Sequence, residues 1–151
     1  MCYNKVMDIW TRLGRYASFE TERMYLRPFT YKDSQDFFEI CSNPDNLRFI
    51  FPSRATREES DFVMVYYFMK EPLGVWAIED KKTHKMIGWI RFEKLDPSRM
   101  TAEIGYFMNK AFWGEGLMTE CLKTLAFLNF QELGLQNLHV IAHAENIASQ
   151  R

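Results

Sequence analysis

Cysteine is scarce in this sequence, and no two cysteines form a recognisable motif. The chain carries three cysteines, Cys2, Cys41 and Cys121, and contains no Cys-x-x-Cys pair. A secreted disulfide framework uses an even set of cysteines at regular spacings. The odd and scattered set therefore favours free or structural thiols in a reducing compartment, and we expect a cytoplasmic protein.

Long apolar runs and an excess of one charge are also absent. No window approaches the roughly 20 apolar residues that a membrane helix requires, and the N-terminus lacks the pattern of a signal peptide. The net charge of -1 gives no overall attraction to nucleic acid or to an acidic membrane. The densest basic stretch, DKKTHK at 80–85, is expected to be a solvated turn. We therefore expect neither a nucleic-acid nor a membrane partner.

Apolar material, in contrast, is abundant. Hydrophobic residues make up 47% and aromatic residues 16% of the 151-residue chain, which is enough for one packed domain and argues against disorder. No repeats, low-complexity tracts or linkers divide it. Residues 1–18 show no clear period and are expected to form an N-terminal extension, either mobile or packed, on a domain spanning 19–151.

Strands and helices are expected to alternate along the chain. The predicted strands are 22–28, 73–79, 86–93, 101–109 and 135–143, with a hairpin joining the second and third. The predicted helices are 30–42, 56–71, 117–133 and a final one beginning near 145. The last complete strand–helix–strand unit is long enough for a parallel crossover. The fold class is therefore α/β or α+β with a mixed sheet.

The two long helices carry recognisable ends and faces. Thr56 and Glu59 form a capping-box pattern at the start of the earlier helix, and Gly134 stands where a C-terminal glycine cap belongs in the later one. The earlier helix is expected to bury Phe62, Val63, Tyr66, Tyr67 and Met69. The aromatic residues expected to be mostly core are Phe37, Phe38, Tyr66, Tyr67 and Trp76.

The stretch FWGEGLMTE, residues 112–120, places two glycines directly before the helix 117–133. Glycines let a ligand approach the backbone, and a helix N-terminus stabilises a phosphate. Gly114 and Gly116 are equally consistent with a tight strand-to-helix turn. A P-loop and a Gly-x-Gly-x-x-Gly motif are both excluded, because neither pattern occurs.

Longer stretches of the chain resemble the GNAT N-acetyltransferase family, in particular its RimJ/RimL-type branch. These stretches are FETERMYLRPFTYKD, WAIEDKKTHKMIG, AEIGYFMNKAFWGEGLMTE and HAENIAS, in this order. The resemblance runs from about Phe19 to Arg151. It implies a GNAT fold with splayed central strands, a site for acetyl-CoA, and transfer of an acetyl group to an amine. Family members also have two further C-terminal strands and often a tyrosine there that protonates the departing thiolate.

The resemblance also implies the cofactor site. The pyrophosphate would lie on the amides of Trp113, Gly114, Glu115, Gly116, Leu117, Met118 and Thr119. The preceding strand would contact the pantetheine arm through Phe107, Met108 and Asn109. Asn146 matches a cofactor-binding asparagine and Ser149 a small polar position close to it. Trp113 is common at its position in this branch, whereas Met118 stands where glycine or alanine is usual.

Because this sequence ends before the two further strands, we expect them to be lacking. The strand 135–143 is then an exposed edge. We therefore expect either a truncated product or a partner, such as a second copy of the chain, that completes the sheet.

Glu103 is the predicted catalytic base, since it lies in AEIGY on the strand that enters the cleft. The alternative is a structural carboxylate paired with a nearby lysine or arginine. Asn146 is also a good helix N-cap. His139 and His143 fall on a strand and lack the glutamate of a His-Glu-x-x-His site, so no metal is expected. Cys121 is expected to pack in the core.

The sequence therefore predicts an acetyl-CoA-dependent N-acetyltransferase that works by direct transfer. Its acceptor would be a protein N-terminus or a small-molecule amine. The alternative is a catalytically silent CoA-binding or subunit-interaction module, which the early end of the chain motivates.

Overall fold

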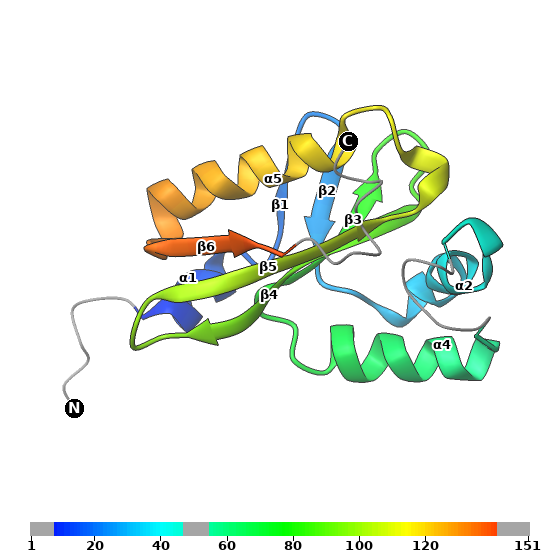
Figure 1. The fold of residues 1–151 in the computed structure, drawn as a ribbon, viewed down its shortest axis with the longest axis horizontal. Coiled ribbons are helices and arrows are strands. Elements are labelled where there is room, and N and C mark those ends of the chain that lie inside the picture. The colour runs from blue at the N-terminus through cyan, green and yellow to red at the C-terminus, as the bar shows by residue number, and fades with distance from the viewer. Residues whose placement is uncertain (1–7, 47–54, 142–151) are drawn as a thin grey trace.

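A mixed six-stranded sheet forms the centre of the molecule (Figure 1). The structure is a computed structural model and describes residues 8–46 and 55–141. The strands are β1 (Phe19–Glu20), β2 (Met24–Arg27), β3 (Val75–Asp80), β4 (Met86–Asp96), β5 (Thr101–Met108) and β6 (Asn137–Val140). Their order in the sheet is their order in the chain. Neighbours are antiparallel from β1 to β5, and β6 runs parallel to β5, so the predicted mixed sheet and parallel crossover are confirmed.

The predicted hairpin between β3 and β4 is also present, with DKKTHK as its turn. The Asp80 carboxylate accepts hydrogen bonds from the Thr83 amide at 3.1 Å and from the Thr83 hydroxyl at 2.7 Å. His84 adopts a left-handed φ of 61° to complete the turn. A short side chain that binds nearby backbone in this way is typical of tight turns.

One face of the sheet packs against α1 (Ile9–Arg15) and α5 (Leu117–Leu128). Cys121 and Leu125 of α5 are fully buried there, as the helical spacing predicts. After Leu128 the helix continues as a π-helical turn, Asn129–Leu133, and ends at Gly134 with φ 76°. The predicted glycine cap is therefore confirmed.

The helix α1 is an element that the sequence analysis did not identify. The Asp8 carboxylate caps it by accepting a hydrogen bond from the Thr11 amide at 2.7 Å. Ile9 and Leu13, one turn apart, are buried in the same core as α5. The Arg12 guanidinium donates to the Leu133 carbonyl at 3.1 Å. Part of the N-terminal extension therefore packs on the domain.

The opposite face carries α2 (Ser34–Ser42) and α4 (Arg57–Met64), around a second buried cluster. The predicted capping box at Thr56 and Glu59 is present. A π-helical turn, Val65–Met69, extends α4. In Figure 1 both helices lie on the side of the sheet away from α5.

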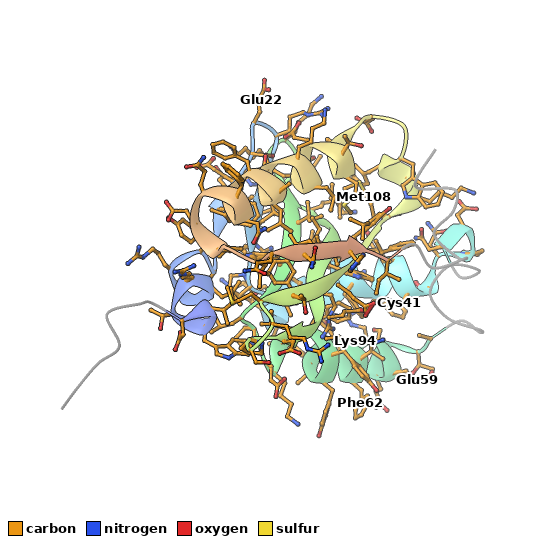
Figure 2. All side chains as sticks on the ribbon, turned by 60° about the vertical axis from the view of Figure 1, so that its left-hand side comes forward. Glu22, Cys41, Glu59, Phe62, Lys94 and Met108 are labelled. Carbon is orange, nitrogen blue, oxygen red and sulfur yellow. The ribbon has the colours of Figure 1, made fainter. Side chains whose placement is uncertain are left out.

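The face that α4 buries differs from the predicted one. Met64 and Phe68 are buried, whereas the predicted core residues Phe62, Tyr66 and Tyr67 are more than half exposed. Figure 2 shows Phe62 pointing away from the sheet. Its ring stacks on Tyr66 with a centroid distance of 4.3 Å. The helix has apolar side chains on two faces, and the spacing alone selected the wrong one.

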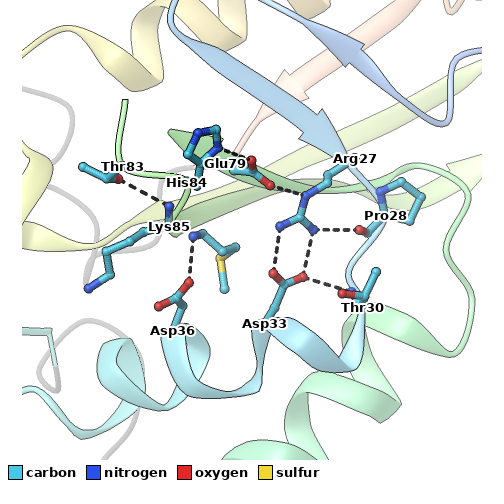
Figure 3. Close-up of polar contacts among 10 residues, drawn as sticks. Arg27, Pro28, Thr30, Asp33, Asp36, Glu79, Thr83, His84 and Lys85 are labelled. Atoms are coloured by element: carbon cyan, nitrogen blue, oxygen red, sulfur yellow. Dashed lines mark hydrogen bonds and ion pairs between the residues drawn. The ribbon is translucent and has the colours of Figure 1, made fainter. Parts of the chain in front are cut away.

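Arg27 at the end of β2 fastens α2 to the sheet (Figure 3). Its guanidinium donates two hydrogen bonds to the Asp33 carboxylate, at 2.8 and 2.9 Å, and one to Glu79 on β3 at 2.8 Å. The hydrogen bonds to Asp33, more than those to Glu79, raise the pKa of Arg27. Such a bidentate pair sets geometry as well as adding energy.

The predicted helix from 145 onward and the segment 47–54 lie outside the described residues. Among the helices that the structure describes, none has the length and apolar character to cross a membrane.

Candidate functional site

The loop between β5 and α5 has the conformation that its two glycines allow. Gly114 has φ 87°, and Gly116, the N-cap of α5, has φ 75°. A Cβ atom added at Gly114 would meet no heavy atom within 4 Å, and one at Gly116 would meet only the Arg23 guanidinium, at 3.8 Å. The glycines are therefore required for their left-handed dihedrals, and the space above the loop is open.

This open space lies at the N-terminus of a helix of 12 residues. Gly116 has no side chain to cap the helix, and no side chain in the described part of the chain accepts from the first-turn amides of Leu117, Met118 and Thr119. Unpaired amides and the positive end of the helix dipole both favour an anion. The loop therefore suits a phosphate group chemically, and the turn and phosphate interpretations of its glycines are compatible.

The only acidic residue in the first turn of α5, Glu120, is directed away from this loop into a clamp on the β1–β2 turn. Its carboxylate accepts hydrogen bonds from the Thr21 hydroxyl at 2.5 Å, the Arg23 amide at 2.9 Å and the Arg23 Nε at 2.7 Å. Arg23 also donates to the Glu115 carbonyl at 3.1 Å. The clamp thus ties the glycine loop to the sheet. Burial opposes ionisation of Glu120, but the hydrogen bonds from Thr21 and Arg23 outweigh it and lower its pKa.

Glu120→Gln is expected to lower the free energy of unfolding by roughly 1.5 kcal/mol near neutral pH, as for hydrogen bonds to a charged group. The pKa of Glu120 in the folded protein lies below the reference value of 4.5, so its carboxylate contributes its whole stabilisation at pH values above 4.5. It is lost as pH falls through the folded pKa. Urea unfolding of both proteins from about pH 7 to about pH 3 would measure it. A difference that stays constant over this range would contradict the role of the Glu120 charge.

A second open feature is the half of β5 that does not pair with β6. The parallel ladder pairs Thr101 to Ile104 of β5 with β6, whereas from Gly105 to Met108 the described residues pair β5 with β4 alone. The Asn109 amide donates to Ile87 of β4, and the Ile104 carbonyl accepts from Ile141 on the other side. Because backbone groups alternate along a strand, those of Met108 point toward the open side and those of Phe107 toward β4.

The indole of Trp113 joins these two features. Its N–H donates to the Met108 carbonyl at 2.6 Å, which draws the start of the glycine loop onto the end of β5. On the other side of β5, the backbone of β4 at Gly88 lies very close to β5. A Cβ atom at Gly88 would lie 2.3 Å from the Phe107 carbonyl oxygen. Phe107, Met108 and the glycine loop, which are all predicted cofactor contacts, therefore lie close together, and their role in binding stays a prediction.

Asn46 supports the same turn from the α2 side. It is fully buried, its amide oxygen accepts from the Lys110 N–H at 2.9 Å, and its amide nitrogen donates to the Asn109 side chain at 3.3 Å. Residues 44–46 are helical, although they lie outside the predicted helices 30–42 and 56–71. A hydrogen bond between residues 64 positions apart leaves no pattern in the sequence.

Glu103, the predicted base, lies on β5 with 28% of its side chain exposed. Its Oε1 atom is 3.3 Å from the Lys94 Nζ. That oxygen is enclosed and accepts no hydrogen bond from the described residues. Its direct neighbours across the sheet are Glu93 and His139. The ion pair that the structural alternative expects is thus present, and the catalytic role stays a prediction.

The remaining candidate residues are the buried cysteines and two residues outside the described ranges. Cys121 is fully buried as predicted, and burial, with the Glu120 charge beside it, raises the pKa of its thiol to about 12, so it is unsuited to act as a thiolate. Cys41 is equally buried and burial raises its pKa to about 12. Asn146 and Ser149 lie outside the described residues. Sequence reasoning missed the Arg23–Glu120 clamp and Asn46, because each joins distant segments.

Comparison with known proteins identifies the family of the chain. The model of the acetyltransferase (GNAT) domain matches residues 23–151. The uncharacterized N-acetyltransferase YoaA of Bacillus subtilis is 30% identical over 136 residues, which cover 87% of this chain and 77% of that protein. The ribosomal-protein-serine acetyltransferase of Escherichia coli is 29% identical over 70 residues, covering 46% of this chain and 39% of that protein.

Solved structures show the same fold. The acetyltransferase (GNAT family) from Bacillus anthracis superposes with a TM-score of 0.71 at 24% identity, covering 89% of this chain and 78% of that one. With a family model that matches from β2 to the last residue, the chain belongs to the GNAT acetyltransferase family.

Proposed function

We propose that this acetyltransferase uses acetyl-CoA to acetylate an amine by direct transfer. The observation that carries the proposal is the adjacency of two open features, the uncapped N-terminus of α5 and the half of β5 that does not pair with β6. A pyrophosphate needs the first and an extended arm needs the second. The Trp113–Met108 hydrogen bond holds them together.

Several residues would hold the cofactor. The amides from Trp113 to Thr119 are the proposed pyrophosphate site. Phe107, Met108 and Asn109 are the proposed contacts of the pantetheine arm, and of these only Met108 has backbone groups that face the open side of β5. Asn146 and Ser149 are kept as proposed contacts. When bound, the cofactor supplies an acetyl group activated as a thioester.

The protein's own groups then have two tasks. An N–H on β5 stabilises the negative charge that develops on the carbonyl oxygen of the thioester. The N–H of Met108 is the proposed donor, because it points toward the open side of β5. Glu103 takes a proton from the amine, directly or through water. Neither task requires a covalent acetyl-enzyme, and both cysteine thiols that the structure describes are buried.

The acceptor is proposed to be a protein N-terminus or a small-molecule amine. The Escherichia coli relative is named a ribosomal-protein-serine acetyltransferase, so a peptide that begins with serine is the first acceptor to test. A catalytically silent module is not favoured, because the relatives that cover most of the chain are named N-acetyltransferases.

Acetyl-CoA is expected to stabilise the protein in thermal unfolding. At about 100 times its dissociation constant, a ligand that binds only the folded state adds roughly 2.7 kcal/mol. ATP and NAD at the same concentration are the controls, since they share the pyrophosphate but lack the pantetheine arm. Equal shifts with all three would indicate a general phosphate site, and no shift with acetyl-CoA would contradict the proposed function.

A further inference from the structure

A groove of about 820 Å³ opens along β4, between Trp10 of α1 and the π-helical turn that follows α4. Its wall includes Trp10, Tyr67, Glu71, Arg91, Glu93 and Lys94. Figure 2 shows Lys94 on the α4 side of the sheet, whereas Met108 lies toward the start of α5. The groove reaches the middle of β4, the strand that pairs with β5 beside the proposed acetyl site.

Within this groove, Glu93 projects over β5. It is the direct cross-strand partner of Glu103, so both side chains lie on the same face as Phe107. Its carboxylate does not remain opposite Glu103. A Cβ atom added at Gly105 would lie 2.8 Å from the Glu93 Oε1 and 3.6 Å from its Oε2. The carboxylate therefore rests on Gly105, one step along β5 from Glu103 toward Phe107.

The Glu93 carboxylate has no hydrogen bond or ion pair among residues 8–46 and 55–141. The neighbouring cations do not form an ion pair with it in the part of the chain that the structure describes. Lys94 pairs with Glu103. The Arg91 guanidinium donates through Nη1 to the Tyr67 carbonyl and lies 5.2 Å from the centre of the Phe68 ring, while its buried Nε has no hydrogen-bond partner among the described residues. A half-enclosed carboxylate without a hydrogen bond or a close ion pair is costly, so this position suits a cationic ligand.

We propose that Glu93 binds the acceptor amine in its protonated, ammonium form and thereby selects cationic primary amines. The inference rests on the proposed function, because the acceptor has to meet the acetyl group beside Met108. Glu93 would hold the ammonium group over Gly105, between Glu103 and Phe107. In this proposal Glu93 recognises the amine, and Glu103 removes the proton from it.

The test uses the full chain with two probes of the groove. Butylammonium is a minimal primary ammonium ion, and 1-butanol is its uncharged counterpart. Carbon-13 NMR of protein labelled at the glutamate carboxyl carbons reports binding without turnover, and Glu93→Gln assigns the Glu93 resonance. Glu71→Gln is the matched control, since it removes the same charge from the wall of the same groove. Gly105→Ala displaces the carboxylate while keeping its charge.

We expect butylammonium, and not butanol, to shift the Glu93 resonance. With a hexapeptide that begins with a free serine, Glu93→Gln and Gly105→Ala should each raise the KM of the peptide about 10-fold, the lower range for a hydrogen bond to a charged group. Their kcat should stay within about 2-fold of wild type, and Glu71→Gln should change neither constant.

Two results would overturn the role of Glu93: equal effects of Glu93→Gln and Glu71→Gln, or a Glu93 resonance that butylammonium leaves in place. Failure of the proposed function would show separately, as the absence of an acetyl-CoA-specific thermal shift in the wild-type protein.

Discussion

Glu103→Gln is expected to reduce kcat for acetyl transfer by about 10²- to 10⁴-fold, the usual contribution of a general base. Glutamine keeps the shape of the side chain and its place on β5 but cannot accept the proton of the amine. The loss should appear as slower release of free CoA thiol at saturating acceptor. The acetyl-CoA-dependent thermal shift should remain, because Glu103 is not among the proposed cofactor contacts.

Lys94→Met is the matched control, because it removes the partner of Glu103 and leaves the carboxylate. Lys94 is 81% exposed, and such surface pairs contribute about 0–1 kcal/mol to stability. If Glu103 serves only this ion pair, both variants should have the same small effect on stability and on turnover. A Glu103→Gln enzyme that turns over within about 2-fold of wild type would reject the catalytic role.

Gly88→Ala is expected to destabilise the protein by about 1–3 kcal/mol, as overpacking does, and to abolish the acetyl-CoA-dependent thermal shift. The new Cβ would lie 2.3 Å from the Phe107 carbonyl oxygen and 2.9 Å from the Met108 Cα. Both are backbone atoms, so β5 itself has to move. That movement displaces the part of β5 proposed to contact the pantetheine arm.

Gly14→Ala provides the control for this prediction. A Cβ at Gly14, in the helix α1, meets no heavy atom within 4 Å, and alanine is favoured over glycine inside helices. This variant should be as stable as wild type or slightly more so, with the acetyl-CoA shift retained. If Gly88→Ala also keeps a full acetyl-CoA shift, the end of β5 is not part of the cofactor site.

Much of the fold could be predicted from the sequence because its patterns are local. Met24 and Leu26 alternate with exposed Tyr25 in β2, and the helix from Leu117 to Gly134 buries residues at helical spacing, among them Cys121 and Leu125, and ends at a glycine. The short helix α1 escaped prediction because Ile9 and Leu13 alone do not define a period. The face of α4 was wrong because its aromatic residues occur on two sides.

The candidate site, like the fold, could be predicted only where its pattern is local. The glycine loop and its place before α5 follow from nine consecutive residues, 112–120. The contacts that shape the site join distant positions: Arg23 and Glu120 are 97 residues apart, and Asn46 and Lys110 are 64 apart. The position of the Glu93 carboxylate over Gly105 depends on strand register, which only the folded sheet defines.

The order of the strands also has a consequence for how the chain folds. Because sheet order equals chain order, every strand from β2 onward pairs with the strand synthesised just before it, so the sheet is able to grow by local steps as the chain leaves the ribosome. The helix α1 is the exception. It is synthesised before all six of these strands, yet its Arg12 binds the Leu133 carbonyl, 121 residues later. A helix made before the sheet is therefore among the last elements to dock, and amide hydrogen exchange should show α1 opening before the strands do.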